Sequence, residues 1–187
     1  MIKLTDLLKI NNMKYSSDVK PKHKKKINME TKLISNDMLV PETPFPENSS
    51  RHTREELEWL INYNDGKINE DMVKDGDNVL KNFKAYCKEN KLNFDNDYYE
   101  KILKETTKTI LSLKYYYNRP RPYQLGEYYD IPDFKIHKLD SAKTPAYPSG
   151  HTTQAYVISG LLSKKYPEHS NEFNNIANFV SESRIMA

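Results

Sequence analysis

Apolar residues recur at helical spacing in several separate stretches of this chain. In the first of them, Leu57 and Ile61 share one apolar face. Thr53-x-x-Glu56 precedes that face in the form of a capping box, in which two side chains satisfy free backbone N–H groups. We therefore expect a helix that begins near Thr53 and ends before the turn signal at residues 64–66.

Two further helices are predicted in the middle of the chain. Residues 72–87 follow a helical pattern that Gly76 weakens, because glycine disfavours a helix interior. Asp97-x-x-Glu100 can cap a third helix, whose apolar positions continue to Tyr117. The following Arg119-Pro120-Arg121-Pro122 holds two prolines that cannot continue a helix, so the third helix ends before them.

The last third of the chain is predicted to hold a long ordered loop and two helices. Residues 123–147 contain prolines and several polar positions, and loops of this length in a compact domain are often functional. We expect one helix from Gly150 to about Lys165, stopped by Pro167, and another from about His169 onward. No stretch alternates apolar and polar residues as a strand does, so the predicted class is all-α.

The first 45 residues differ in character from the rest of the chain. They contain a short run of lysines at positions 20, 22, 24, 25 and 26, followed by the proline-containing stretch PETPFPENSS. We predict a mobile or loosely docked arm with a linker over residues 1–45, and a helical domain over residues 46–187. The lysines could contact phosphate groups or acidic surfaces, but no aromatic residues alternate with them, which favours a solvated tail.

The composition fits a soluble globular protein of one domain, with 187 residues that are 37% hydrophobic and 29% charged. The net charge of +3 does not by itself indicate a nucleic-acid partner. No stretch approaches the roughly 20 apolar residues of a membrane span, and the first residues lack the apolar core of a signal peptide. A cytoplasmic location is the default expectation. Cys87 stands alone, which excludes an intramolecular disulfide, and we expect it in the core.

Three short motifs predict an oxyanion site. They are Lys114 with Arg121-Pro122, then Pro148-Ser149-Gly150-His151, then Ser183-Arg184. Arginine supplies a charge that does not titrate and paired donors for two oxygens, and a helix N-terminus supplies backbone N–H groups. We predict that phosphate is bound by Lys114, Arg121, Ser149, Gly150 and Arg184. His151 lies in the first turn of a helix, where it can protonate a leaving oxygen.

Each motif alone has a simpler explanation. Lys114 and Arg121 could be solvated surface charges, and the Arg-Pro pairs could form a proline-rich docking segment. Pro-Ser-Gly-His could be a helix start that Ser149 caps. The order and the gaps of all the motifs together argue against coincidence.

These residues resemble the type 2 phosphatidic acid phosphatase and vanadium haloperoxidase superfamily, whose motifs have the form K-x6-R-P, P-S-G-H and S-R-x5-H. The segments YYNRPRPYQL and KTPAYPSGHTTQAY are similar to its soluble, bacterial-type acid phosphatase branch. The resemblance covers about residues 40–187. It implies a helical bundle that hydrolyses phosphomonoesters through a phosphohistidine, without a metal or another cofactor, with His151 as the general acid. No set of His, Asp and Glu has metal-ligand spacing.

The third motif lacks its last residue. The nucleophilic histidine of the family corresponds to position 190, and Ala187 is the last residue of the sequence. We therefore expect a C-terminally truncated fragment that binds phosphate weakly and has essentially no turnover. The remaining histidines do not occupy the family's position, and we expect them at the surface or in loops. They are His23, His52, His137 and His169.

Two other functions stay open at this point. The same site can hold vanadate in place of phosphate, so a vanadate-dependent haloperoxidase is one alternative. The second is a truncated, non-catalytic anion-binding protein whose lysine-rich arm contacts nucleic acid or membrane phosphates. The phosphatase hypothesis implies a small phosphorylated substrate, with no nucleic-acid partner and no membrane span.

Overall fold

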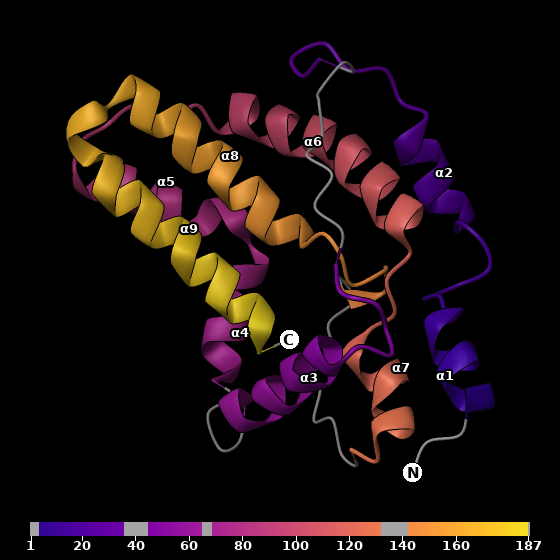
Figure 1. Cartoon of the computed structure of the whole chain (residues 1–187). Coiled ribbons are helices and arrows are strands. Elements are labelled where there is room, and N and C mark those ends of the chain that lie inside the picture. The colour runs from indigo at the N-terminus through magenta and orange to yellow at the C-terminus, as the bar shows by residue number, and fades with distance from the viewer. Residues whose placement is uncertain (1–3, 36–44, 65–68, 132–141, 187) are drawn as a thin grey trace.

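The computed structural model describes residues 4–35, 45–64, 69–131 and 142–186. Every regular element in these ranges is a helix, which confirms the all-α class (Figure 1). In chain order the elements are α1 (Leu4–Asn11), α2 (Pro21–Ile27), α3 (Arg51–Asn64), α4 (Glu70–Asp77), α5 (Val79–Glu89), α6 (Asn96–Tyr117), α7 (Pro122–Gly126), the 3-10 helix η1 (Glu127–Tyr129), α8 (Gly150–Lys165), the 3-10 helix η3 (Pro167–His169) and α9 (Ser170–Ile185).

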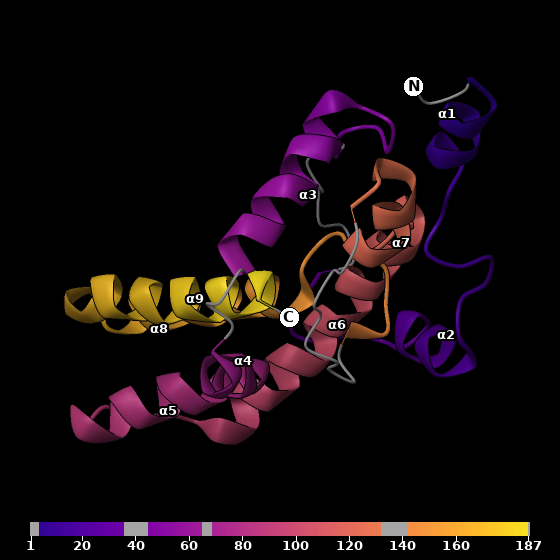
Figure 2. The ribbon, with the colours of Figure 1, turned by 90° about the horizontal axis from the view of Figure 1, so that it is seen from below.

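The main core lies between α5, α6, α8 and α9. Figures 1 and 2 show α8 and α9 side by side and antiparallel, joined by the short turn around η3. Ile158 and Leu162 of α8 are fully buried against Phe173 of α9 and Phe83 of α5. Cys87 is also fully buried in this cluster, so its predicted place in the core is confirmed. Each of these helices therefore buries one apolar stripe against its neighbours.

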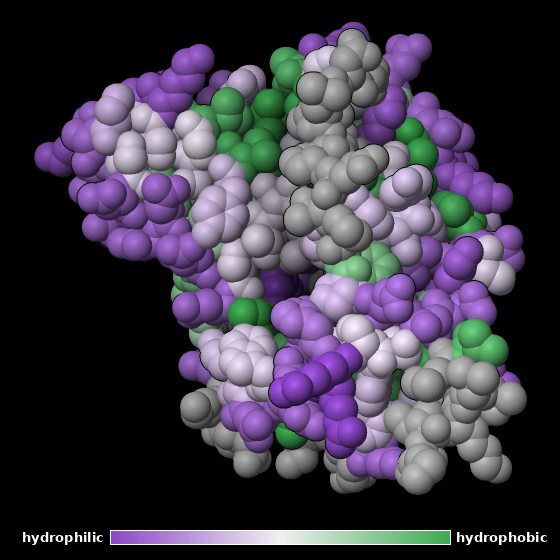
Figure 3. Space-filling model, in the orientation of Figure 1, coloured by the Kyte–Doolittle hydropathy of each residue, from purple (hydrophilic) through white to green (hydrophobic). Residues whose placement is uncertain are grey.

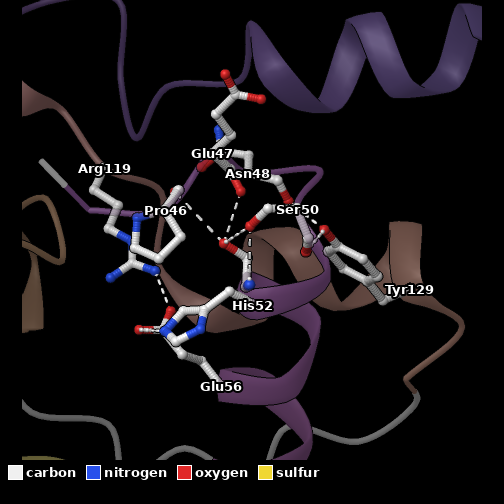
Figure 4. Close-up of polar contacts among 9 residues, drawn as sticks. Pro46, Glu47, Asn48, Ser50, His52, Glu56, Arg119 and Tyr129 are labelled. Atoms are coloured by element: carbon white, nitrogen blue, oxygen red, sulfur yellow. Dashed lines mark hydrogen bonds and ion pairs between the residues drawn. The ribbon is translucent and has the colours of Figure 1, made fainter.

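A second, smaller core joins the N-terminal helices to the segment after α6. Ile10 of α1, Leu57 of α3 and Leu125 of α7 are buried together, with Tyr129 of η1 beside them. The Tyr129 hydroxyl donates a hydrogen bond to the Asn48 carbonyl oxygen, which fixes the start of α3 on this layer (Figure 4). The two cores leave the C-terminal end of α6 between them.

The predicted capping box at Thr53 is wrong. α3 begins at Arg51, and the Ser50 hydroxyl accepts the Thr53 N–H at 3.1 Å. Thr53 is buried, and its hydroxyl donates to the Glu47 carbonyl at 2.8 Å. Glu56 forms an ion pair with Arg119 at 2.5 Å instead of reaching back to the helix start (Figure 4). A different local cap at Ser50 and the distant partner of Glu56 therefore replace the predicted box.

Two other predicted boundaries also differ from the structure. Residues 72–87 form two helices, α4 and α5, because Asn78 between them has an extended backbone with φ −101° and ψ 90°. α6 is capped by Asp95, whose carboxylate accepts the Tyr98 N–H at 3.0 Å, and not by Asp97. By contrast α6 ends at Tyr117 before the prolines, and α8 spans Gly150–Lys165, both as predicted.

The predicted long loop over residues 123–147 is helical at its beginning. α7 and η1 occupy residues 122–129, and Leu125 and Tyr129 bury their side chains in the smaller core. Residues 132–141 of the predicted loop lie outside the described residues. The segment from Thr144 to Ser149 then leads into α8.

The described part of the N-terminal arm is packed on the helical domain. α2 lies beside the C-terminal half of α6 (Figures 1 and 2). His23 is buried, and its Nδ1 is 2.7 Å from the Tyr115 hydroxyl. Lys20 Nζ donates to the Lys143 carbonyl at 2.8 Å. This differs from the expectation of a mobile or loosely docked arm, because a buried histidine and a long-range hydrogen bond attach α2 to the domain.

Candidate functional site

A cavity of about 450 Å³ lies where the C-terminal ends of α6 and α9 meet the N-terminal end of α8. In Figure 3 a recess with strongly hydrophilic atoms at its floor opens near the C-terminal end of α9. The cavity is lined by every residue that the sequence predicts for the oxyanion site. These are Lys114, Arg121, Ser149, Gly150, His151 and Arg184. They come from three motifs that are separated by up to 70 positions along the chain, counted from Lys114 to Arg184.

Lys114 is the most deeply buried cation of the site. It lies in the last turn of α6 with 6% of its surface exposed, and its Nζ donates to the Pro145 carbonyl at 2.6 Å. Burial lowers the pKa of the Lys114 ammonium to about 7, and the nearby Arg121 charge contributes to this shift. An anion in the cavity would restore the charged form, because it offsets the repulsion from Arg121.

Arg121 is held at the end of α6 by the change of chain direction there. Asn118 ends the helix in the left-handed conformation with φ 48°. Arg121 Nε donates to the Thr144 carbonyl at 2.8 Å, and its backbone N–H donates to Gln124 at 2.9 Å. Arg119, two residues earlier, binds Glu56 and does not line the cavity (Figure 4). The two arginines of the Arg-Pro pairs therefore have different roles.

Gly150 and Ser149 bring the start of α8 against α6. A methyl group at Gly150 would lie 3.4 Å from an Ile110 side-chain carbon and 3.8 Å from Lys114 Cε. The Ser149 hydroxyl caps α8 by accepting the Thr152 N–H at 3.4 Å. The first N–H groups of a helix have no acceptor within the helix, so those of Gly150 and His151 are available to an anion. Ser149 therefore acts here through its hydroxyl as the helix cap.

Arg184 and His151 share a carboxylate that the sequence reading missed. Arg184 lies in the last turn of α9, and its guanidinium is 2.8 Å from Asp77 Oδ1 at the end of α4. His151 Nε2 lies 3.3 Å from the same oxygen. A second Arg184 nitrogen donates to the Val73 carbonyl at 2.5 Å. Asp77 belongs to none of the motifs, and only the packing of α4 on α9 brings it to the site.

The charge of His151 depends on competing neighbours. Burial lowers the pKa of the imidazole below its usual value, and the Arg184 charge lowers it further. The Asp77 carboxylate raises the pKa of His151, while Lys114 acts in the opposite direction. A phosphoryl dianion in the cavity would neutralise the two cations and favour the imidazolium form. His151 can therefore gain its proton when a ligand is bound, as a general acid requires.

Three residues of α2 also line the cavity, which the sequence reading did not predict. They are Lys22, His23 and Lys26. The lysines on both sides of His23 are visible in the sequence, but the position of α2 beside α6 is not. Among the described residues that line the cavity, none is acidic. Asp77 contacts Arg184 and His151, and the cavity lining itself carries cations from α2, from the end of α6 and from α9.

The other histidines do not all lie at the surface. His52 is exposed, as predicted. The prediction is wrong for His23, which is buried. His169 lies in the short connection η3 and is partly exposed, with its Nδ1 2.7 Å from the Tyr86 hydroxyl and its ring against Phe173. His137 lies outside the described residues. His23 and His169 each form a hydrogen bond with a tyrosine of another helix, and these bonds hold the neighbouring helices together.

Residues 4–35, 45–64, 69–131 and 142–186 contain no cluster of His, Cys, Asp and Glu that could hold a metal ion. In the same ranges no helix has both the length and the apolar character needed to cross a membrane. Comparison with protein-family models, with curated proteins and with solved structures found no match.

Proposed function

We propose that the cavity is the phosphoryl-binding site of a metal-independent phosphomonoester hydrolase, in a helical domain of the type 2 phosphatidic acid phosphatase and haloperoxidase kind. The observation that carries this proposal is the convergence of all six motif residues on one cavity of about 450 Å³. Their convergence supports a common ligand because separate surface charges would not be expected to line one cavity.

The electrostatics of the site favour an anionic ligand. The Arg121 charge contributes to the lowered pKa of Lys114, and neither side chain forms an ion pair with a described residue. Burying two like charges without a counter-ion is unfavourable, and a phosphoryl dianion would relieve that cost. Arg184 adds a third cation, with Asp77 holding its guanidinium in place.

The proposed reaction divides the chemistry among these residues. A histidine attacks phosphorus, so that an N–P bond forms while the P–O bond to the leaving group breaks. His151 donates a proton to the leaving alkoxide, and it then accepts a proton from the water that hydrolyses the phosphohistidine. Arg121, Arg184 and Lys114 stabilise the charge on the three remaining oxygens in both steps. The attacking histidine is the one that the resemblance assigns to position 190, and the 187-residue sequence supplies the donors and the acid.

Arg121→Ala tests the phosphate site, with Arg119→Ala as the matched control. Charge-assisted hydrogen bonds contribute about 1.5–3 kcal/mol, so we expect Arg121→Ala to weaken orthophosphate binding by about 10-fold or more in calorimetry. Arg119 pairs with Glu56 outside the cavity, and its removal should change the affinity by less than about threefold. Thermal unfolding of both variants confirms that each remains folded. Equal affinity of wild type and Arg121→Ala would refute the site.

Hydrolysis of p-nitrophenyl phosphate tests the proposed reaction in a chain that contains the attacking histidine. There Arg121→Ala should lower kcat/KM by about 100-fold or more, as removal of an oxyanion donor typically does. A preparation loaded with vanadate that oxidises bromide with peroxide, and that does not hydrolyse the ester, would replace the phosphatase by the haloperoxidase alternative.

A further inference from the structure

We propose that α2 forms a second anion subsite in the same cavity, so that the preferred ligand carries a second phosphoryl group besides the one held by Arg121 and Arg184. The inference rests on the proposed function and extends it to the class of substrate. It assigns a binding role to residues that lie outside the part of the chain covered by the family resemblance. The following observations support it.

The lysines that line the cavity share one face of α2. Lys22 and Lys26 are four residues apart, which places them one above the other on the same side of the helix. Lys24 and Lys25 belong to the same short helix but do not line the cavity. Two of the five lysines in the run therefore line the cavity, and these two can bind one anionic group together.

α2 is fixed over the cavity by contacts on both sides. On the side of α6, buried His23 is 2.7 Å from the Tyr115 hydroxyl. On the other side, Lys20 Nζ donates to the carbonyl of Lys143, a residue that itself lines the cavity. A lysine pair on a packed helix loses less conformational freedom upon binding than one on a free tail. This makes α2 suited to recognise a ligand rather than only to attract it.

The chain after α2 is anchored by a second set of hydrogen bonds. The backbone N–H groups of Lys32, Leu33 and Ile34 all donate to one carboxylate oxygen of Glu105, at 3.0, 2.7 and 3.0 Å. Glu105 lies in the middle of α6, about two and a half to three turns before Lys114 and Tyr115. Because the same helix also binds His23, both ends of the segment from α2 to residue 34 are attached to α6.

The charge near α2 is not balanced within the site. Lys22 and Lys26 form no ion pair with a described residue, and the described residues that line the cavity include no acid. The charges of Lys22, Lys20 and Lys26 also lower the pKa of His23, in addition to the larger effect of its burial. An anionic group next to α2 would offset the repulsion between these lysines and His23. In the same way, an anionic group next to Arg121 would offset the repulsion between Arg121 and Lys114.

The size of the cavity leaves space for more than one phosphoryl group. Pockets that hold whole small molecules have volumes of about 300–1,000 Å³, and this cavity of about 450 Å³ falls within that range. Three cations, Lys114, Arg121 and Arg184, and the start of α8 already surround one phosphoryl position. The lysines of α2 therefore remain for a second one on the same ligand.

The test compares orthophosphate with inorganic triphosphate as probes, using calorimetry at constant ionic strength. The double variant Lys22→Gln/Lys26→Gln is compared with Lys24→Gln/Lys25→Gln, which loses the same charge from the same helix. We expect the first variant to lose about 10-fold or more of its triphosphate affinity and less than about threefold of its orthophosphate affinity. The control variant should lose less than about threefold for either probe. Thermal unfolding measures whether α2 remains docked in each.

Two results would overturn the subsite. One is an equal loss of triphosphate affinity in the two double variants, which would mean that only net charge matters. The other is an equal loss for orthophosphate and triphosphate in Lys22→Gln/Lys26→Gln, which would place both lysines at the first phosphoryl position. Arg121→Ala distinguishes a missing α2 subsite from a wrong proposed function. If the phosphoryl site exists, this variant lowers the affinity for both orthophosphate and triphosphate, whether or not α2 forms a subsite.

Discussion

At the scale of single residues, Lys114 combines deep burial with a charge that the proposed function needs. Its Nζ has the Pro145 carbonyl as a partner, but no carboxylate forms an ion pair with it among the described residues. Asp77 is the acidic group beside the site. Its carboxylate contacts both the guanidinium of Arg184 and the imidazole of His151, and it therefore holds the two side chains next to each other. A lysine in a cavity whose pKa burial lowers to about 7 is typical of functional sites.

The shifted pKa of Lys114 predicts how stability depends on pH without ligand. Burial lowers this pKa to about 7 in the folded protein, while the unfolded chain keeps the ordinary value of 10.5. Between these values the unfolded state binds one more proton, so raising the pH increases the free energy of unfolding, by about 1.4 kcal/mol per pH unit. Lys114→Met lacks the group and should lack this contribution. Urea denaturation at pH 7.5, 8.5 and 9.5 measures the difference, and parallel pH curves for the two proteins would contradict the burial of a titrating amine.

At the scale of elements, the close contact of α4 with α9 positions the acidic partner of the site. A methyl group at Gly76 would lie 1.9 Å from the hydroxyl oxygen of Ser183 and 2.5 Å from its Cβ. Ser183 is fully buried, and its hydroxyl already donates to the Val180 carbonyl at 2.6 Å. Gly76 therefore allows α4 to approach α9 so closely that Asp77 reaches Arg184.

Gly76→Ala tests this contact, and Gly160→Ala on α8 is its control. Overpacking of a buried contact costs about 1–3 kcal/mol, so we expect Gly76→Ala to lower the free energy of unfolding by that amount and to weaken phosphate binding. A methyl group at Gly160 meets nothing within 4 Å, and alanine is favoured in a helix, so that variant should be unchanged or up to about 1 kcal/mol more stable. Equal stability of the two variants in urea denaturation would show that α4 can move away without cost.

The elements that the sequence predicts well are those with local signals. α8 has its capping Ser149 directly before it and Pro167 shortly after it, and α6 ends where the Arg-Pro pairs begin. The division between α4 and α5 and the true cap of α3 were missed, because buried contacts with distant segments override the local pattern there. Glu56 is the clearest case, since its carboxylate pairs with Arg119, 63 positions away, rather than reaching back to the start of the helix.

At the scale of the whole molecule, the site depends on three long-range associations. The motif residues could be predicted because Lys114, Arg121, His151 and Arg184 follow one another in the order and at the gaps of the three motifs. The contribution of Asp77 could not be predicted, because it depends on a contact with a residue 107 positions away. The approach of α2 to α6 joins residues 92 positions apart through His23 and Tyr115. No local signal in the lysine run indicates which of its side chains face a cavity.

The measurement that tests the central claim most directly is a titration of the protein with orthophosphate, followed by NMR of its backbone and arginine N–H groups. The account predicts saturable shifts that are largest at the Gly150 and His151 amides and at the guanidinium N–H groups of Arg121 and Arg184. These groups belong to three separate segments, so simultaneous shifts with one dissociation constant indicate one site. Shifts confined to the lysines of α2, or no saturable shift at any of these groups, would contradict the claim that the cavity binds a phosphoryl group.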